Sequence, residues 1–218
     1  MGKRQDNLFG LLANSGYPVI EPLLRLRRQD IQASGLGSEV QSVYEQLDGE
    51  LDDFPDNVGG WDLRVGAVVI ELDEAQHFNR YRLQTLESSV YSKLPNFPMS
   101  AYRSFCVGRE AQCLATAKHR GYWSNPSCIR QFGPKSPEGD LTPPGSPRWK
   151  QRAFYDFLKD LSPIMCDIKL ARISIWDEVP ANGVNVPVNQ VLRSRSSEAV
   201  PGLVALIEKR AGVNLQKE

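Results

Sequence analysis

The chain has 218 residues, of which 41% are apolar and 24% are charged, and its 26 basic side chains equal its 26 acidic ones in number. This length supports one domain with a sizeable core, and the composition excludes a disordered, collagen-like or disulfide-rich chain. The net charge of zero excludes a uniformly basic nucleic-acid coat, although a basic face on one side of the molecule stays possible.

No stretch of the sequence approaches the 18 or more consecutive apolar residues that a membrane-spanning helix requires, so we expect no membrane segment. The apolar patch at residues 8–13 is interrupted by Gly10 and is not followed by a cleavage site, which argues against a signal peptide. Four cysteines without an export signal then indicate reduced thiols or metal ligands in a cytoplasmic protein.

The N-terminal region is expected to form an arm followed by a helix. Residues 1–37 combine a helical candidate at residues 7–13 with two prolines and a glycine pair, which is typical of a leading arm. Ser38 is a suitable N-cap for a helix that ends near residues 49–53, because Gln41 stands at the capping-box position and apolar residues recur along one face.

A hairpin is predicted after the Gly59-Gly60 pair. Residues 61–65 alternate between apolar and polar side chains, Gly66 supplies a turn, and residues 67–73 begin with a continuous apolar run. Such a run indicates a strand that is buried on both faces at the centre of a sheet. A helix is expected over residues 78–94, because leucines and tyrosines recur there at helical spacing until Pro95.

The second half of the chain begins with residues 95–147, which end in a proline- and glycine-rich loop and are expected to form an inserted subdomain. Three further elements follow. Residues 148–161 carry an apolar stripe at helical spacing, residues 169–176 alternate as a strand does, and residues 200–210 predict another amphipathic helix.

These elements predict an α/β fold with a mixed central β-sheet flanked by helices and an inserted subdomain. We expect one domain over residues 1–218, in which residues 38–94 and 148–218 form the core. The arm at 1–37 and the insertion at 95–147 would be added to that core.

Three carboxylates, an amide and an imidazole fall within seven residues at the end of the buried strand. Glu71 and Asp73 project from the same face because strand side chains alternate, and Asp62 lies opposite them if the hairpin is in register. A cluster of unpaired acids is electrostatically costly, and a hard divalent cation is the usual compensation. We therefore predict that Asp62, Glu71 and Asp73 hold Mg²⁺ or Mn²⁺.

Gln76 and His77 follow the strand directly, where they could position a metal-bound water or donate to a phosphate. A bound Mg²⁺ lowers the pKa of a coordinated water and neutralises charge on a scissile phosphate, so these residues fit phosphodiester hydrolysis. In a purely structural alternative, the two strand acids face solvent or pair with arginines of the following helix, namely Arg80 and Arg82.

At this point the sequence resembles a known family. Asp62, the run Val-Ile-Glu-Leu-Asp-Glu-Ala-Gln-His at residues 69–77, and Arg82 with Leu86 are similar to the very-short-patch-repair-like branch of the restriction-endonuclease-like (PD-(D/E)XK) superfamily. In that branch, an aspartate on one strand precedes an E-x-D-x-x-x-H run on the next, and an R-x-x-x-L helix follows. The segment at residues 171–176 also resembles the later core strand, which often carries an arginine.

The resemblance implies roles for individual residues. Asp62 matches the metal-binding aspartate, Glu71 and Asp73 match the acidic pair, and His77 matches the active-site histidine. Glu39 stands loosely where the family often has a glutamate that adds a metal or water contact. Asp73 occupies the position of a lysine found in many superfamily members, which makes a non-catalytic member an alternative.

A second candidate site lies in the insertion. Cys106, Cys113, His119 and Cys128 fall within 23 residues, and zinc accepts three thiolates and one imidazole in a structural site. The spacing lacks a tight Cys-x-x-Cys knuckle, so buried free cysteines are the alternative to a structural Zn²⁺.

Basic and aromatic residues are interleaved from residue 102 to residue 152, whereas residues 39–74 are acidic. This asymmetry suits a nuclease that places acids around a metal and bases along phosphates, although solvated helix faces explain it equally well. The cations expected to contact nucleic acid are Arg82, Lys150 and Arg152.

The sequence therefore predicts a Mg²⁺- or Mn²⁺-dependent endonuclease acting on DNA. The alternative is a non-catalytic protein of the same fold that binds nucleic acid or another protein. A nucleotide hydrolase using the same acids is disfavoured because the sequence has no glycine-rich phosphate loop.

Overall fold

A mixed four-stranded sheet lies at the centre of the computed structural model, which describes residues 2–20, 26–56, 59–118, 121–166 and 168–217. The strand order is β1-β2-β3-β4, in which β1, β2 and β3 pair antiparallel and β3 and β4 pair parallel. The four strands are β1 (Val19–Ile20), β2 (Leu63–Val65), β3 (Val68–Asp73) and β4 (Lys169–Ser174).

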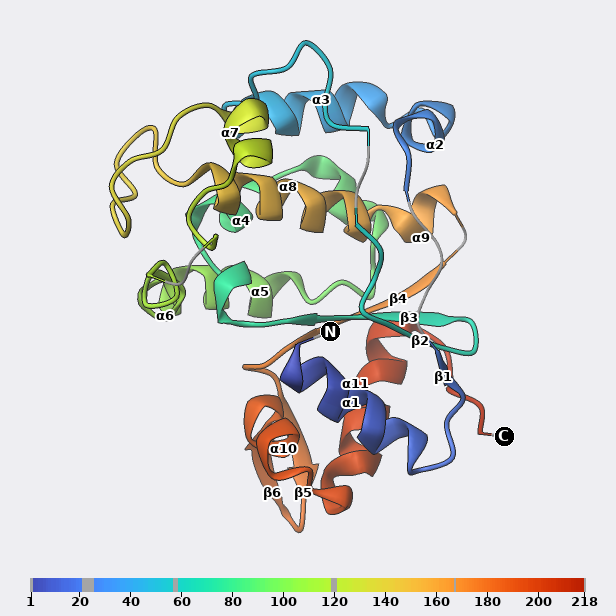
Figure 1. Cartoon of the computed structure of the whole chain (residues 1–218). Helices are drawn as coiled ribbons and strands as arrows, with labels where there is room; N and C mark the ends of the chain where they lie inside the picture. The colour runs from blue at the N-terminus through green and yellow to red at the C-terminus, as the bar shows by residue number, and fades with distance from the viewer. Residues whose placement is uncertain (1, 21–25, 57–58, 119–120, 167, 218) are drawn as a thin grey trace.

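Helices cover both faces of this sheet (Figure 1). One face carries α8, with α4 and α5 beside it and α3 and α7 beyond it, and the other face carries α1, α10 and α11. The α-helices are α1 (Lys3–Ala13), α2 (Arg28–Ala33), α3 (Gly37–Gln46), α4 (Arg80–Thr85), α5 (Met99–Gly108), α6 (Glu110–Leu114), α7 (Pro126–Phe132), α8 (Pro147–Asp160), α9 (Ser162–Met165), α10 (Val188–Ser194) and α11 (Val200–Ala211). Short 3-10 helices are η1 (Ala75–His77), η2 (Ser89–Lys93) and η3 (Ser197–Ala199), and β5 (Glu178–Ala181) pairs with β6 (Val184–Pro187) as a separate hairpin.

The sheet separates two hydrophobic cores. Val68, Ile70 and Leu72 of β3 pack with α1, α10 and α11, whereas Val69 packs with α8 and its neighbours. Because strand side chains alternate, Glu71 and Asp73 share the face of Val69 and point toward α8. All six residues of β3 are buried, which confirms the expected central strand.

The mixed α/β sheet flanked by helices is confirmed, as are the hairpin, the helix at α8 and the C-terminal helix. The helix expected over residues 78–94 is instead divided into α4 and η2. Asn79 accepts backbone hydrogen bonds that begin α4, and the Ser88 side chain caps η2 by accepting from the Val90 amide. These local hydrogen bonds break the helical course that periodicity alone indicates.

The N-terminal segment contributes more than an arm. Leu8 and Leu12 of α1 are fully buried in the core beneath the sheet, and Asn7 donates to the carbonyl of Leu192 in α10. Residues 95–147 supply α5, α6 and α7, and side chains such as Tyr102 and Phe132 pack into the core that contains α8. No helix in the described part of the chain is long and apolar enough to cross a membrane.

Candidate functional site

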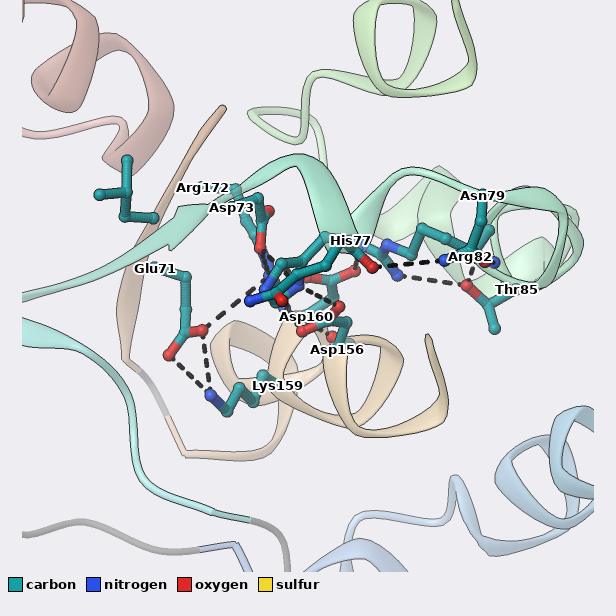
Figure 2. A network of polar contacts seen from close by, with 12 residues as sticks. Glu71, Asp73, His77, Asn79, Arg82, Thr85, Asp156, Lys159, Asp160 and Arg172 are labelled. Carbon is teal, nitrogen blue, oxygen red and sulfur yellow. Dashed lines mark hydrogen bonds and ion pairs between the residues drawn. The ribbon is translucent and has the colours of Figure 1, made fainter. Parts of the chain in front are cut away.

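A buried polar network fills the space between β3, β4 and α8 (Figure 2). Glu71 lies opposite Arg172 in the parallel register of β3 and β4, so both side chains point to the same face of the sheet. The helix α8 completes the network with three side chains at helical spacing, namely Asp156, Lys159 and Asp160.

Arg172 is the centre of this network. Its Nη1 donates to Asp73 Oδ1 over 2.6 Å, and its Nε donates to Asp160 Oδ1 over 2.7 Å. Its Nη2 donates to the backbone carbonyl of Asp156 over 2.9 Å, and Asp156 Oδ1 lies 3.3 Å from Nη1. One fully buried guanidinium therefore compensates three buried carboxyl groups, which explains how these acids can share a dry interior.

Arg82 has a structural role that differs from the predicted nucleic-acid contact. It is almost completely buried, and its Nη2 donates to Asp160 Oδ2 over 2.6 Å. Its Nη1 donates to Tyr91 and Thr85. The prediction that Arg82 binds DNA, or pairs with the strand acids, is therefore wrong, because the apolar surroundings force this cation to pair inside the core.

His77 connects β3 to α8. Its Nδ1 lies 2.7 Å from Asp156 Oδ2 and 3.2 Å from Asp73 Oδ1. Because both neighbours are acceptors, Nδ1 carries the proton and donates between the two carboxylates. The His77 side chain is 17% exposed. It is more exposed than the side chains of its neighbours in the network, which are Glu71, Asp73, Asp156 and Lys159.

The pKa values of the two aspartates around His77 are shifted in opposite directions. Burial raises the pKa of Asp73, and this outweighs Arg172 and His77, which act in the other direction. The hydroxyl of Tyr102 also donates to Asp73 Oδ2 over 2.6 Å. Although burial acts on Asp156 as well, His77 and Arg172 hold the pKa of that carboxyl well below its ordinary range. Asp156 is therefore the firmly ionised acid of the pair.

Glu71 forms a second buried pair with Lys159. The Nζ of Lys159 donates to both carboxyl oxygens of Glu71, over 2.9 and 3.0 Å. Burial raises the pKa of Glu71 to about 8, although Lys159 opposes the shift. Asp62 lies beside this pair, because its backbone amide donates to Glu71 Oε1 and its own carboxylate accepts from the Leu72 amide.

A pH dependence of stability follows from the raised pKa of Glu71. Between the unfolded pKa of 4.5 and the folded pKa of about 8, the folded chain holds a proton that the unfolded chain has released. The stabilisation is therefore complete below pH 4.5 and is lost as the pH rises through 8. We expect urea denaturation to show wild-type stability falling relative to Glu71→Gln by at most about 1.4 kcal/mol per pH unit. A pH-independent difference between the two proteins would contradict this expectation.

The donor atoms that come together in the described residues belong to Asp73, His77 and Asp156, and lie within 4.8 Å of one another. Asp73 and His77 were predicted to act together, and the structure brings them into contact. Asp62 and Glu71 lie next to this group but outside it, since Lys159 holds the carboxyl group of Glu71. The set Asp62, Glu71 and Asp73 is thus replaced by one that includes Asp156 from α8.

Gln76 and Glu39 have different surroundings. Gln76 follows Ala75 in η1, and its backbone carbonyl accepts from Asn79 and the thiol of Cys113. Glu39 lies on α3, which is separated from the sheet by α8, and its carboxylate accepts from the Ser88 hydroxyl. The expected metal contact of Glu39 is not formed, because α3 packs on the outer side of α8.

The cysteines of the insertion do not form a zinc site among the residues that the structure describes. Cys106, Cys113 and Cys128 are buried free thiols, and they do not join a common group of ligand atoms. Burial raises the pKa of Cys106 and of Cys113 to about 12, which opposes the thiolate that zinc requires. Cys128 instead contacts Asn125 at the start of α7. The fourth predicted ligand, His119, lies outside the described residues.

The other two predicted DNA contacts differ from each other. Lys150 is 2% exposed, and its Nζ lies 2.6 Å from Asp48, so the prediction that it contacts DNA is wrong. Arg152 lies one helical turn before Asp156, and its guanidinium is 6.0 Å from the ring of Tyr122. Its Nη1 is buried without a hydrogen-bond partner in the described part of the molecule. Within the described residues, the guanidinium of Arg152 therefore forms no ion pair with a carboxylate.

Sequence reasoning missed Asp156, Lys159 and Asp160. The sequence does contain a signal for them, because these charged residues interrupt the apolar stripe of α8 at spacings of three and four. Charged side chains on the buried face of a helix need partners, and the polar face of β3 supplies them.

One family model, described as Family of unknown function (DUF7255), matches residues 42–194. That match includes β2, β3, α8 and β4, and therefore every side chain of the polar network. No curated protein and no solved structure matches the chain.

Proposed function

The chain belongs to the DUF7255 family, and we propose that it is a divalent-metal-dependent nuclease that hydrolyses phosphodiester bonds of DNA. The observation that supports this proposal is the convergence of Asp73, His77 and Asp156 at the end of a central strand. Two of these residues belong to the E-x-D-x-x-x-H pattern that resembles the restriction-endonuclease-like superfamily, and the third comes from α8.

The donor set fits a divalent cation. Asp73 and Asp156 offer one carboxylate oxygen each, and His77 offers Nδ1 once its proton has left. An imidazole beside two carboxylates suits Mn²⁺ better than Mg²⁺, which prefers an all-oxygen shell. When bound, such an ion would activate water and neutralise charge on the scissile phosphate.

The residues around this group would position the substrate. His77 is the most exposed of the three ligands, so the phosphate would approach from its side. Arg152, which lies one turn away on α8 without an ion-pair partner in the described chain, would contact a phosphate oxygen. Lys159 would keep Glu71 in a fixed orientation next to Asp73 and help to exclude bulk water.

One observation favours the alternative of a non-catalytic binding protein. Each of the four buried acids of the network, namely Glu71, Asp73, Asp156 and Asp160, already contacts a cationic side chain of the protein. A network that is compensated in this way folds without a metal ion. In that case, DNA binding would persist in chelator and would weaken steeply with salt.

The proposal is tested by the nicking of supercoiled plasmid in Mn²⁺, in Mg²⁺ and in chelator. We expect nicking that depends on the metal, with Mn²⁺ more effective than Mg²⁺. Glu39→Gln serves as a control, because Glu39 contacts Ser88 far from the group of ligands and its loss should leave the rate unchanged. Bound but uncleaved DNA under every metal condition would favour the binding protein instead.

A further inference from the structure

A groove lies at the carboxyl ends of the two parallel strands. It has a volume of about 650 Å³ and is lined by residues from the α5–α6 junction, from the segment after β4, and from α10. Ligands of open α/β sheets bind outside the carboxyl ends of the strands, which is where this groove opens. Its lining includes Arg109, Trp176, Glu178, Asn189 and Arg193.

The groove is connected to the candidate metal group. Trp176 comes two residues after Ser174, which pairs with Asp73 in the sheet. Arg4 also joins the two regions, because its guanidinium donates to Glu74, which follows Asp73, and to Asn189 in the groove. Arg4 and the end of β4 therefore link the groove to the strand that carries Asp73.

The chemistry of the lining suits an unpaired nucleotide. The guanidinium of Arg109 lies 4.7 Å from the centre of the Trp176 ring, so the aromatic ring supports an exposed planar cation. The Nε1 of Trp176 is buried and has no acceptor among the described residues. Arg193 adds a second exposed cation, and Glu178 is the one acid in the described lining.

We propose that this groove binds single-stranded DNA next to the cleavage centre, with a base stacked on Arg109 and a backbone phosphate held by Arg193. Stacking on an aromatic ring or an arginine plane requires a base that is free of its duplex neighbours. The inference rests on the proposed nuclease function, since it names the form of DNA that the centre receives. A substrate with an unpaired segment, such as a flap or a gap, fits this arrangement.

Binding of a labelled oligodeoxythymidylate in chelator tests the groove without requiring any cleavage. We expect Arg109→Ala and Arg193→Ala each to weaken binding by about tenfold, which is the loss of one stacking or phosphate contact. Arg109→Lys keeps the positive charge but removes the planar guanidinium on which a base would stack, so we expect this variant to bind as weakly as Arg109→Ala. The matched control is Arg130→Ala, an exposed arginine on α7 outside the groove, which should bind like the wild type.

The outcomes separate this inference from the proposed function. If Arg109→Ala and Arg193→Ala bind the oligonucleotide as tightly as the wild type does, the groove is not the site that binds single-stranded DNA, even if metal-dependent nicking is observed. Full rescue by Arg109→Lys, or tighter binding of a blunt duplex of the same length, would overturn stacking of an unpaired base. If the two alanine variants bind more weakly but the wild type does not cleave DNA, the result would support DNA binding in the groove and contradict the proposed nuclease activity.

Discussion

Replacement of Arg172 by methionine is expected to lower the free energy of unfolding by about 3–5 kcal/mol. Methionine fills much of the volume of the arginine stem but leaves Asp73, Asp156 and Asp160 without the guanidinium that contacts all three. Breaking a buried charge network by removing one partner costs far more than the pair contributes, because the remaining charges stay desolvated. Urea denaturation followed by circular dichroism measures this loss.

The matched control for this stability measurement is Arg130→Met. Arg130 is exposed on α7, so its replacement should change the free energy of unfolding by no more than about 0.5 kcal/mol. If Arg172→Met does not fold, Arg172→Lys keeps a positive charge and should give a folded protein of reduced stability. An Arg172→Met protein as stable as the control would show that Arg172 does not compensate these acids.

The second large effect is expected from His77→Ala, which should reduce metal-dependent nicking of plasmid DNA by about 100-fold or more. The substitution removes one of three donors and the group nearest to solvent, whereas Arg172 continues to compensate Asp73 and Asp156. The protein should therefore remain folded, with a free energy of unfolding within about 1 kcal/mol of the wild type.

The control for cleavage is again Glu39→Gln, because Glu39 belongs to α3, which lies beyond α8 from the sheet (Figure 1), and its carboxylate contacts Ser88. If His77→Ala nicks DNA at a rate within a few-fold of the wild type, His77 is not part of the metal centre. Such a result would also indicate that any activity arises elsewhere in the protein or from a contaminating nuclease.

The strand that carries the site could be predicted because its signals are local. The apolar run before Glu71 predicted a central strand, and alternation placed Glu71 and Asp73 on one face. The hairpin register, set by the short turn at Gly66, brought Asp62 beside Glu71 as expected. Each of these conclusions requires only a few neighbouring residues.

The partners from α8 could not be assigned in this way. Asp156 and Lys159 are more than 80 residues from the strand acids, and their contacts depend on how α8 crosses the sheet. Arg82 and Lys150 show the converse error, because a basic residue in the sequence carries no mark of whether it faces solvent or a buried acid. Charged residues inside an apolar helical stripe are the one available signal.

Binding of Mn²⁺ to the metal-free protein, followed by the electron paramagnetic resonance signal of the free ion, tests the central claim most directly. We expect the wild type to bind about one ion per chain and His77→Ala to lose this binding, since an imidazole and two carboxylates supply the ligands. Equal binding by His77→Ala and the wild type, or no binding by the wild type, would contradict a metal centre at Asp73, His77 and Asp156.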